Sequence, residues 1–361
     1  MARFNPGPRR IRKPANLDDF SLTLITVIMI AIVAIVLITA IYGIIFALSN
    51  PEAPLIGNDV NVSADGDYPF KQEIELKLPE YTINSTTIPA DSITSEYAVL
   101  YNVNSNEIVA SRKSTERIYP ASLTKVMTLI VVYENLPSEE ALDEIIEIKS
   151  KPSGHSGYPL EVGDKLTVKE LIYDAILQSD GIACLALAEY IAGSEAEFVK
   201  LMNDKVKELG LLDDENGRDE TNPSTNFVNC TGLSERYHCS TAYDMAVITA
   251  YAMKNTFCAD VLTTLKYKPN DDRFRPDIKN NVFWSKILHE TDKYNDGAVT
   301  SQTVNIKGGK TGWTGSDSGR CLAVVATGKT SGDLYILVTC KADTWPNAID
   351  DTIILFDTYA K

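Results

Sequence analysis

Ser122 and Lys125 are the residues of this chain whose types and spacing are best suited to chemistry. They lie three positions apart, directly after Tyr119-Pro-Ala121, where the sequence predicts the start of a helix. On a helix such side chains share a face, so the amine can reach the hydroxyl proton and act as its base. By itself the spacing also fits a serine that caps a helix, followed by an ordinary surface lysine. The rest of the sequence has to decide between these interpretations.

Two later segments carry hydroxyl and amine groups that bear on this choice. Ser179 precedes a predicted helix, and alone it is better explained as a helix cap. Lys310-Thr-Gly312 precedes the C-terminal strands, and alone it also fits a glycine-rich turn with a solvated lysine. The order S-x-x-K, serine, K-T-G is typical of active-site serine enzymes that act on peptidoglycan and β-lactams.

With these intervals, the chain resembles the low-molecular-mass penicillin-binding proteins of the D-alanyl-D-alanine carboxypeptidase family from about residue 93 to Lys361. The resemblance extends over several further segments: Pro120 to Thr128, Gly163 to Thr167, Thr225 to Asn229, Gly232-Leu233, Ser240 to Asp244 and Lys310 to Thr314. It implies an α+β, penicillin-binding/β-lactamase-like transpeptidase fold: an antiparallel sheet with an inserted helical subdomain. It also implies a serine-type carboxypeptidase of cell-wall peptidoglycan that β-lactams acylate.

The resemblance assigns the proton and acyl chemistry to three residues. Ser122 would attack the D-Ala-D-Ala peptide carbonyl of a peptidoglycan stem peptide, and Ser179 would pass a proton to the departing D-Ala. Lys125 would be the base, so its amine has to be neutral. Burial beside a second cation lowers a lysine pKa, and we expect Lys310 to supply that cation.

Four residues are assigned to substrate binding. Lys310 and Thr311 would hold the terminal carboxylate of the peptide, for which a cation is suited. Gly312 would leave room for the peptide along the strand edge. The resemblance also implies an oxyanion hole formed by the backbone N–H groups of Ser122 and Trp313.

The chain departs from the family pattern at two places. Gly181 stands where the family's Ser-x-Asn motif has asparagine, and Cys230 and Thr231 replace a proline and a histidine. We expect these changes to affect the rate more than the fold. A related β-lactamase is a weaker alternative, because no convincing glutamate-bearing loop lies between Ser179 and Lys310. A catalytically weak sensor that binds penicillin or peptidoglycan is a further alternative.

The elements that must position these residues are predicted from periodicity. A strand hairpin is expected at 97–101 and 107–110, and a helix at 122–134. Helical patterns dominate 168–210 and recur at 242–254 and 345–359, with strands between the last two. This order predicts an antiparallel sheet whose helical layer is inserted in the middle of the chain.

The N-terminal part has a different character. Residues 20–48 contain no charged residue, Asn, Gln, His or Pro, and about 20 apolar residues cross a bilayer. The run is roughly twice a normal signal-peptide core, which favours an uncleaved anchor over a cleaved signal. Five Lys or Arg residues precede it, which predicts a cytoplasmic N-terminus and a single-pass protein of the cell membrane. The predicted organisation is a basic tail at 1–19, the anchor at 20–48 in the lipid bilayer, an extracytoplasmic linker at 49–92 and the catalytic domain at 93–361.

Composition limits the partners and cofactors. The formal net charge of −15 argues against a nucleic-acid partner. The three histidines form no ligand-spaced cluster, so neither a metal nor another cofactor is expected. Cysteines in an extracytoplasmic domain can be oxidised. Two disulfides are predicted as hypotheses: Cys230–Cys239 across a short loop, and Cys321–Cys340 in a hairpin whose facing positions sum to 661.

Overall fold

The structure is a computed structural model that describes residues 77–152, 160–211, 224–267, 279–280, 283 and 301–361. The predicted membrane anchor at 20–48 lies outside these residues. Within the ranges described, no helix combines the length and apolar character needed to cross a membrane.

A six-stranded sheet is the centre of the domain, with the strand order β1-β3-β2-β12-β11-β10. Its strands are β1 (Glu80–Thr87), β2 (Tyr97–Asn102), β3 (Glu107–Arg112), β10 (Val304–Gly312), β11 (Arg320–Gly328) and β12 (Leu334–Ala342). Short two-stranded pairs join β4 (Arg117–Ile118) to β7 (Ser240–Thr241), β5 (Ile145–Glu147) to β6 (Lys165–Thr167), and β8 (Lys266–Tyr267) to β9 (Lys279–Asn280). Strand β10, which carries the K-T-G motif, therefore forms one edge of the main sheet.

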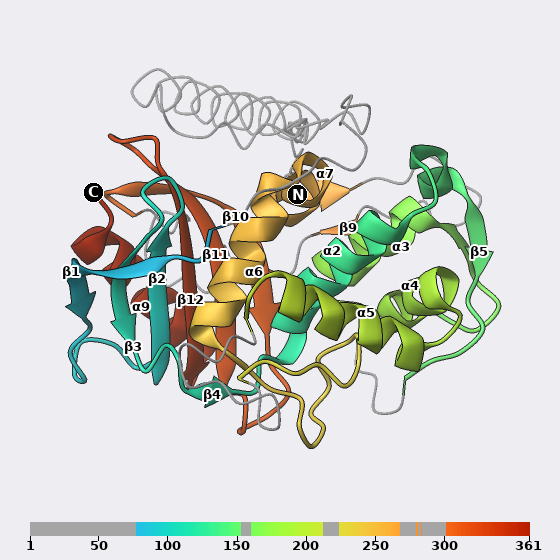
Figure 1. Ribbon diagram of the computed structural model, residues 1–361, viewed down its shortest axis with the longest axis horizontal. Helices are drawn as coiled ribbons and strands as arrows, with labels where there is room; N and C mark the ends of the chain where they lie inside the picture. The colour runs from blue at the N-terminus through green and yellow to red at the C-terminus, as the bar shows by residue number, and fades with distance from the viewer. Residues whose placement is uncertain (1–76, 153–159, 212–223, 268–278, 281–282, 284–300) are drawn as a thin grey trace, which may run out of the picture. The chain divides into compact units, whose positions relative to one another are not determined.

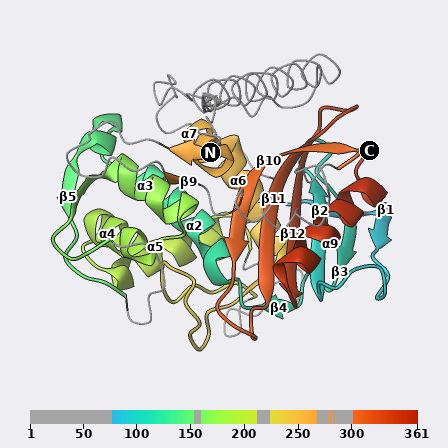
Figure 2. The ribbon, with the colours of Figure 1, turned by 180° about the vertical axis from the view of Figure 1, so that it is seen from behind.

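Alternate residues of the central strands face two separate hydrophobic cores. Val99, Val325 and Val338 pack in the core that also holds α6 (Ala242–Lys254). Leu100 and Leu337 pack in the other core, beneath α9 (Trp345–Tyr359). The two helices thus cover opposite faces, with α6 in front of the sheet in Figure 1 and α9 in front in the reverse view of Figure 2. Such strands, buried on both sides, read as continuous apolar runs.

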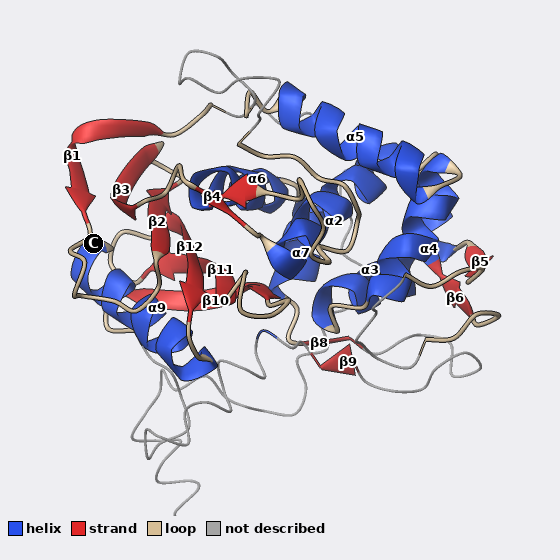
Figure 3. Ribbon diagram, turned by 90° about the horizontal axis from the view of Figure 1, so that it is seen from below, coloured by secondary structure: helices blue, strands red, loops and turns tan. Residues whose placement is uncertain are grey.

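The remaining helices gather beside the sheet (Figure 3). They are η1 (Ala121–Leu123), α2 (Thr124–Asn135), η2 (Glu139–Asp143), α3 (Val168–Leu177), α4 (Gly181–Ala192), α5 (Glu195–Glu208) and α7 (Thr256–Thr263). Side chains mark where three of them begin. Thr167 forms a capping box with Glu170 at α3, and Asp180 and Ser194 cap α4 and α5. These caps satisfy N–H groups that have no partner within the helix.

The predicted C-terminal hairpin is confirmed in its register. Pairs from Leu322 with Thr339 to Thr327 with Leu334 follow the predicted sum of 661. A bulge lies between Arg320 and Leu322, so Leu322 is the last residue that follows the rule and Cys321 does not. The two strands are nonetheless paired as the sequence predicted.

The expectation of a wholly antiparallel sheet is wrong at one edge. Strand β1 pairs in parallel with β3, and it lies inside the segment 49–92 that was predicted to be a linker. Most β1 side chains are exposed, so the strand has no alternating apolar pattern by which a sequence reveals it. The sheet is therefore mixed, and the folded part begins earlier than predicted.

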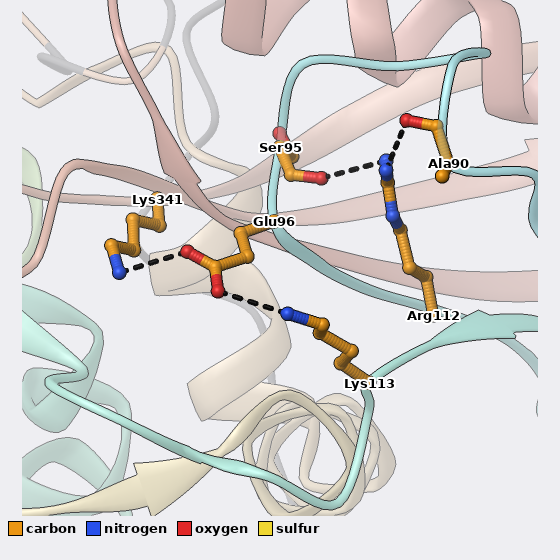
Figure 4. Close-up of polar contacts among 6 residues, drawn as sticks. All are labelled: Ala90, Ser95, Glu96, Arg112, Lys113 and Lys341. Carbon is orange, nitrogen blue, oxygen red and sulfur yellow. Dashed lines mark hydrogen bonds and ion pairs between the residues drawn. The ribbon is translucent and has the colours of Figure 1, made fainter.

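Polar contacts join the start of β2 to the ends of β3 and β12 (Figure 4). The carboxylate of Glu96 accepts from Lys341 at 2.8 Å and from Lys113 at 3.0 Å. Hydrogen bonding by Lys341, and then by Lys113, lowers the pKa of Glu96 to about 2. Arg112 donates to the backbone carbonyls of Ala90 and Ser95 nearby. These contacts lie at the surface, where ion pairs contribute little stability.

Neither predicted disulfide is present, since all six cysteines lie in the described residues and are free thiols. Cys230 donates its thiol to Glu195 Oε1 at 3.2 Å, while Cys239 pairs through its backbone with Asn226. Cys321 and Cys340 do lie side by side, and burial together with a hydrogen bond from the Cys340 thiol to Cys321 raises the pKa of Cys340. The hairpin therefore brings the second pair together without a covalent bond, although a bulge interrupts the predicted register at Cys321.

Candidate active site

Ser122 and Lys125 meet at the start of α2, as the sequence predicted. Ser122 lies in the single turn η1, and Lys125 follows in the first turn of α2. The Lys125 Nζ atom lies 3.0 Å from Ser122 Oγ. A nucleophile within hydrogen-bond reach of a base is the geometry that covalent catalysis requires.

Lys125 is buried, with 3 % of its surface exposed. Burial disfavours the charged amine and lowers its pKa, although Cys184, Cys230 and Asp180 act in the opposite direction. The lowered pKa increases the fraction of neutral amine that can accept the Ser122 proton. Burial, rather than the expected cation of Lys310, is thus the leading cause.

A second lysine and serine pair comes from two other elements. Lys310 of β10 donates to Ser179 Oγ at 2.9 Å and to the carbonyl oxygen of Thr311 at 3.0 Å. Its pKa is lowered well below the ordinary value, first by burial and then by the charge of Lys125. The two lysines therefore lie close enough to interact, and this interaction contributes to the lowered pKa of Lys310.

Tight backbone packing holds Ser122 in place. Ala121 has φ +50°, an unusual value for a residue with a side chain. A Cβ atom at Gly232 would lie 1.9 Å from the Ala121 carbonyl oxygen, and one at Gly312 would lie 2.9 Å from that of Pro120. Gly312 therefore has a packing role, besides the substrate role expected for it. Ser179 also has a positive φ, of +58°, so strained backbone lies directly before Ser122 and at Ser179 itself.

A backbone turn that follows the predicted Thr225 to Asn229 segment completes the surroundings of Lys125. The Lys125 Nζ donates to the carbonyl oxygen of Thr231 at 2.5 Å. Asn229 Oδ1 accepts from Thr231 N, Thr231 Oγ1 and Gly232 N at 2.8 to 3.2 Å. In the sequence, the Thr225 to Asn229 segment was noted only because it resembles the family. The acceptor that follows it is a backbone carbonyl oxygen, which residue types do not reveal.

His238 also contacts the start of α2, through Thr124. Its Nε2 lies 2.8 Å from Thr124 Oγ1, and its Nδ1 accepts from Val228 N at 3.2 Å. The acceptor role of Nδ1 places the proton on Nε2. Burial, with a smaller effect of Lys125, lowers the pKa of His238 to about 4. The histidine is therefore neutral and structural.

The remaining motif positions lie as follows. Gly181 is the first residue of α4, and the preceding Asp180 caps that helix through Ile182 N and Ala183 N. Gly181, at the third motif position, thus offers no side-chain amide to Lys125. Trp313 follows β10, is 52 % exposed and lies under the guanidinium of Arg320.

Comparisons with known proteins agree with this arrangement. A family model described as Peptidase_S11, D-alanyl-D-alanine carboxypeptidase, matches residues 84–344. The D-alanyl-D-alanine carboxypeptidase DacF of Bacillus subtilis is 33% identical over 63% of this chain and 53% of its own length. For DacC of Escherichia coli, these values are 30%, 70% and 57%. The chain thus spans little more than half the length of these relatives.

A solved structure gives the same fold. Penicillin-binding protein D2 from Listeria monocytogenes, in its cefotaxime-bound form, superposes with a TM-score of 0.58. It is 21% identical, and the match covers 75% of this chain and 98% of that one. This likeness identifies a penicillin-binding transpeptidase fold with a mixed sheet and helices.

Proposed function

This chain belongs to the D-alanyl-D-alanine carboxypeptidase family, and on that premise we propose that it is a serine-type carboxypeptidase of peptidoglycan stem peptides. The proposal depends above all on one contact, the 3.0 Å between Lys125 Nζ and Ser122 Oγ with the amine buried. That pair suits attack on a carbonyl by an activated hydroxyl.

The proposed cycle has two halves. Ser122 Oγ attacks the carbonyl of the terminal D-Ala-D-Ala bond while its proton moves to Lys125. The C–N bond then breaks, and the departing D-Ala nitrogen takes the proton held by Lys125 through Ser179, which leaves an acyl-serine and a neutral Lys125. Water attacks the acyl-serine and gives a proton to Lys125, which passes it to Ser122 Oγ as the ester bond breaks, so the shortened peptide leaves and the Ser122 hydroxyl is restored.

Substrate recognition is assigned to the edge strand β10. Lys310 and Thr311 would bind the terminal carboxylate. A buried ammonium group forms strong charge-assisted hydrogen bonds with a carboxylate that displaces water from the site. The backbone N–H groups of Ser122 and Trp313 would stabilise the oxyanion. β-Lactams would acylate Ser122 in the same way, and the Listeria protein has been solved in a cefotaxime-bound form.

We also propose that residues 20–48 anchor the protein in the cell membrane as a single span. The uncharged apolar run and the preceding basic residues support this placement. The catalytic domain would then face the extracytoplasmic side, where peptidoglycan is found.

The test uses the full chain purified in detergent. We expect D-Ala release from a stem pentapeptide and covalent labelling by a fluorescent penicillin, both lost in Ser122→Ala. Ser105→Ala, at an exposed serine in the β2–β3 turn, is the matched control and should retain both. Stable labelling without D-Ala release would favour a penicillin-binding sensor, whereas rapid β-lactam turnover would favour a β-lactamase. Full peptidase activity in Ser122→Ala would disprove the mechanism.

A further inference from the structure

We propose that the turn Asn229–Gly232, held by Glu195, positions Lys125 for its role as the base. We call residues 229–232 the lysine-holding turn. The inference rests on the proposed function and goes beyond it, because it assigns positioning roles to Asn229 and Glu195, residues outside the three motifs.

The first step concerns the direction of the Lys125 lone pair. The amine contacts Ser122 Oγ and the Thr231 carbonyl oxygen at 3.0 Å and 2.5 Å. A neutral amine has two N–H bonds and one lone pair, whereas a carbonyl oxygen only accepts. With an N–H directed at Thr231, the lone pair can turn to the Ser122 hydroxyl hydrogen. The carbonyl thus orients the base without competing for the same proton.

The second step concerns the rigidity of the turn. Asn229 Oδ1 accepts three hydrogen bonds within it, and Asn229 Nδ2 donates to the carbonyl oxygen of Leu233 at 3.0 Å. Gly232 adopts φ +81° against Ala121, a conformation that glycine adopts without strain. The turn is therefore fixed both internally and against the residue that precedes the nucleophile.

The third step shows what ties the turn to its surroundings. Glu195 Oε1, in the first turn of α5, accepts from Cys230 N at 3.0 Å and from Cys230 Sγ at 3.2 Å. From the other side, Thr128 Oγ1 of α2 donates to the Cys230 carbonyl oxygen at 2.7 Å. Thr128 lies one helical turn after Lys125. A short closed path therefore links the base, its helix, the turn and the acceptor carbonyl.

The sequence explains why such a device is needed here. Gly181 has no side chain with which to contact Lys125, so the amide of the Ser-x-Asn motif is missing. The Thr231 carbonyl oxygen supplies a hydrogen-bond acceptor for Lys125 from a different segment of the chain. The proline expected at position 230 has no N–H, whereas Cys230 offers both an N–H and an S–H to Glu195.

The decisive experiment compares Glu195→Ala and Glu195→Gln with Glu197→Ala in the full chain. Glu197 lies in the same first turn of α5 but is exposed and pairs with Lys200, so it controls for helix charge. The measurement is the second-order rate constant of penicillin acylation as a function of pH. Its acid limb reports the proton on Lys125, whose charged or titratable neighbours are Lys310, Cys184, Cys230, Asp180 and His238.

We expect Glu195→Ala to lower acylation about tenfold or more and to move the acid limb to higher pH. The reason is that a loosened turn admits water to a lysine whose pKa is lowered mainly by burial. Glu195→Gln retains an oxygen that can accept from Cys230 N, so it should recover part of the rate. Glu197→Ala should match the unchanged protein.

Two outcomes would overturn the inference: an unchanged rate in Glu195→Ala, or a slower rate with an unshifted acid limb, since the latter indicates only a structural role. If Glu195→Ala fails to fold, Thr128→Val makes the same test from α2, because it removes the donor to Cys230 at nearly constant volume. Failure of the proposed function is recognised separately, because the unchanged protein would then neither be acylated nor release D-Ala.

Discussion

Lys310 and Lys125 are two buried amines in the same candidate site, but each contacts a different serine hydroxyl. Lys125 contacts the nucleophile, whereas Lys310 contacts Ser179 and carries the stronger lowering of its pKa. The charge of Lys125 contributes to the lowered pKa of Lys310, and in the proposed function a bound substrate carboxylate would offset this repulsion. Substrate binding would thereby be linked through charge to the protonation of the two lysines.

We expect Lys310→Met to lower penicillin acylation and D-Ala release about hundredfold, as loss of a preorganised charge typically does. Lys307→Met is the matched control, since Lys307 lies in the same strand with its side chain exposed. Stopped-flow acylation measures the effect. Equal rates in both variants would show that Lys310 is not part of the machinery.

His238 makes stability depend on pH. Its folded pKa of about 4 lies below the ordinary value of 6.5. Between pH 4 and pH 6.5, His238 is therefore protonated in the unfolded chain but neutral in the folded chain. Stability is therefore full above pH 6.5 and falls as the pH drops towards 4, by up to about 3 kcal/mol. His238→Asn keeps an acceptor for Val228 N and should flatten this dependence in urea unfolding. A variant with the same slope as the unchanged protein would contradict the prediction.

At the scale of elements, Gly232 joins the lysine-holding turn to the start of α2. We expect Gly232→Ala to cost at least about 3 kcal/mol or to displace Ala121 and abolish acylation, because its Cβ has no space. Gly193→Ala has a similar φ of +78° but no atom within 4 Å, so it should cost about 1 to 2 kcal/mol from backbone strain alone. Urea midpoints and penicillin labelling compare the two. Equal losses with full labelling would contradict this packing argument.

Elements with a strong apolar pattern could be predicted from sequence, and weakly patterned ones could not. The bounds predicted for 242–254 and 345–359 coincide with α6 and α9, because each has a threonine cap followed by regularly spaced apolar residues. Strand β1 was missed because most of its side chains are exposed. Its place is set by pairing with β3, a contact that local sequence does not encode.

The candidate site shows the same limit. Ser122, Lys125 and Lys310 were found because their side chains carry chemistry at a distinctive spacing. Glu195 gave no such signal, because its role depends on the N–H and S–H of a residue far along the chain. The Thr231 carbonyl could not be found from residue types, since every residue has one.

At the scale of the whole molecule, the proposed membrane anchor can be tested by fractionation. The full chain expressed in bacteria should sediment with membranes and resist alkaline carbonate, because about 20 apolar residues suffice to span a bilayer. A variant lacking residues 20–48 should be soluble and still be labelled by penicillin. Release by carbonate, or a mature N-terminus near Ser49, would instead favour a cleaved signal.

The positions of the two lysines in the chain have a consequence for timing. Ser122 and Lys125 are made early, whereas Lys310 belongs to β10 and reaches Ser179 only when the last three strands join the sheet. We therefore expect a chain that is still leaving the ribosome to have an unreactive Ser122, because Lys310 has not yet reached the proposed site. Completion of the sheet would then be the step that completes the site.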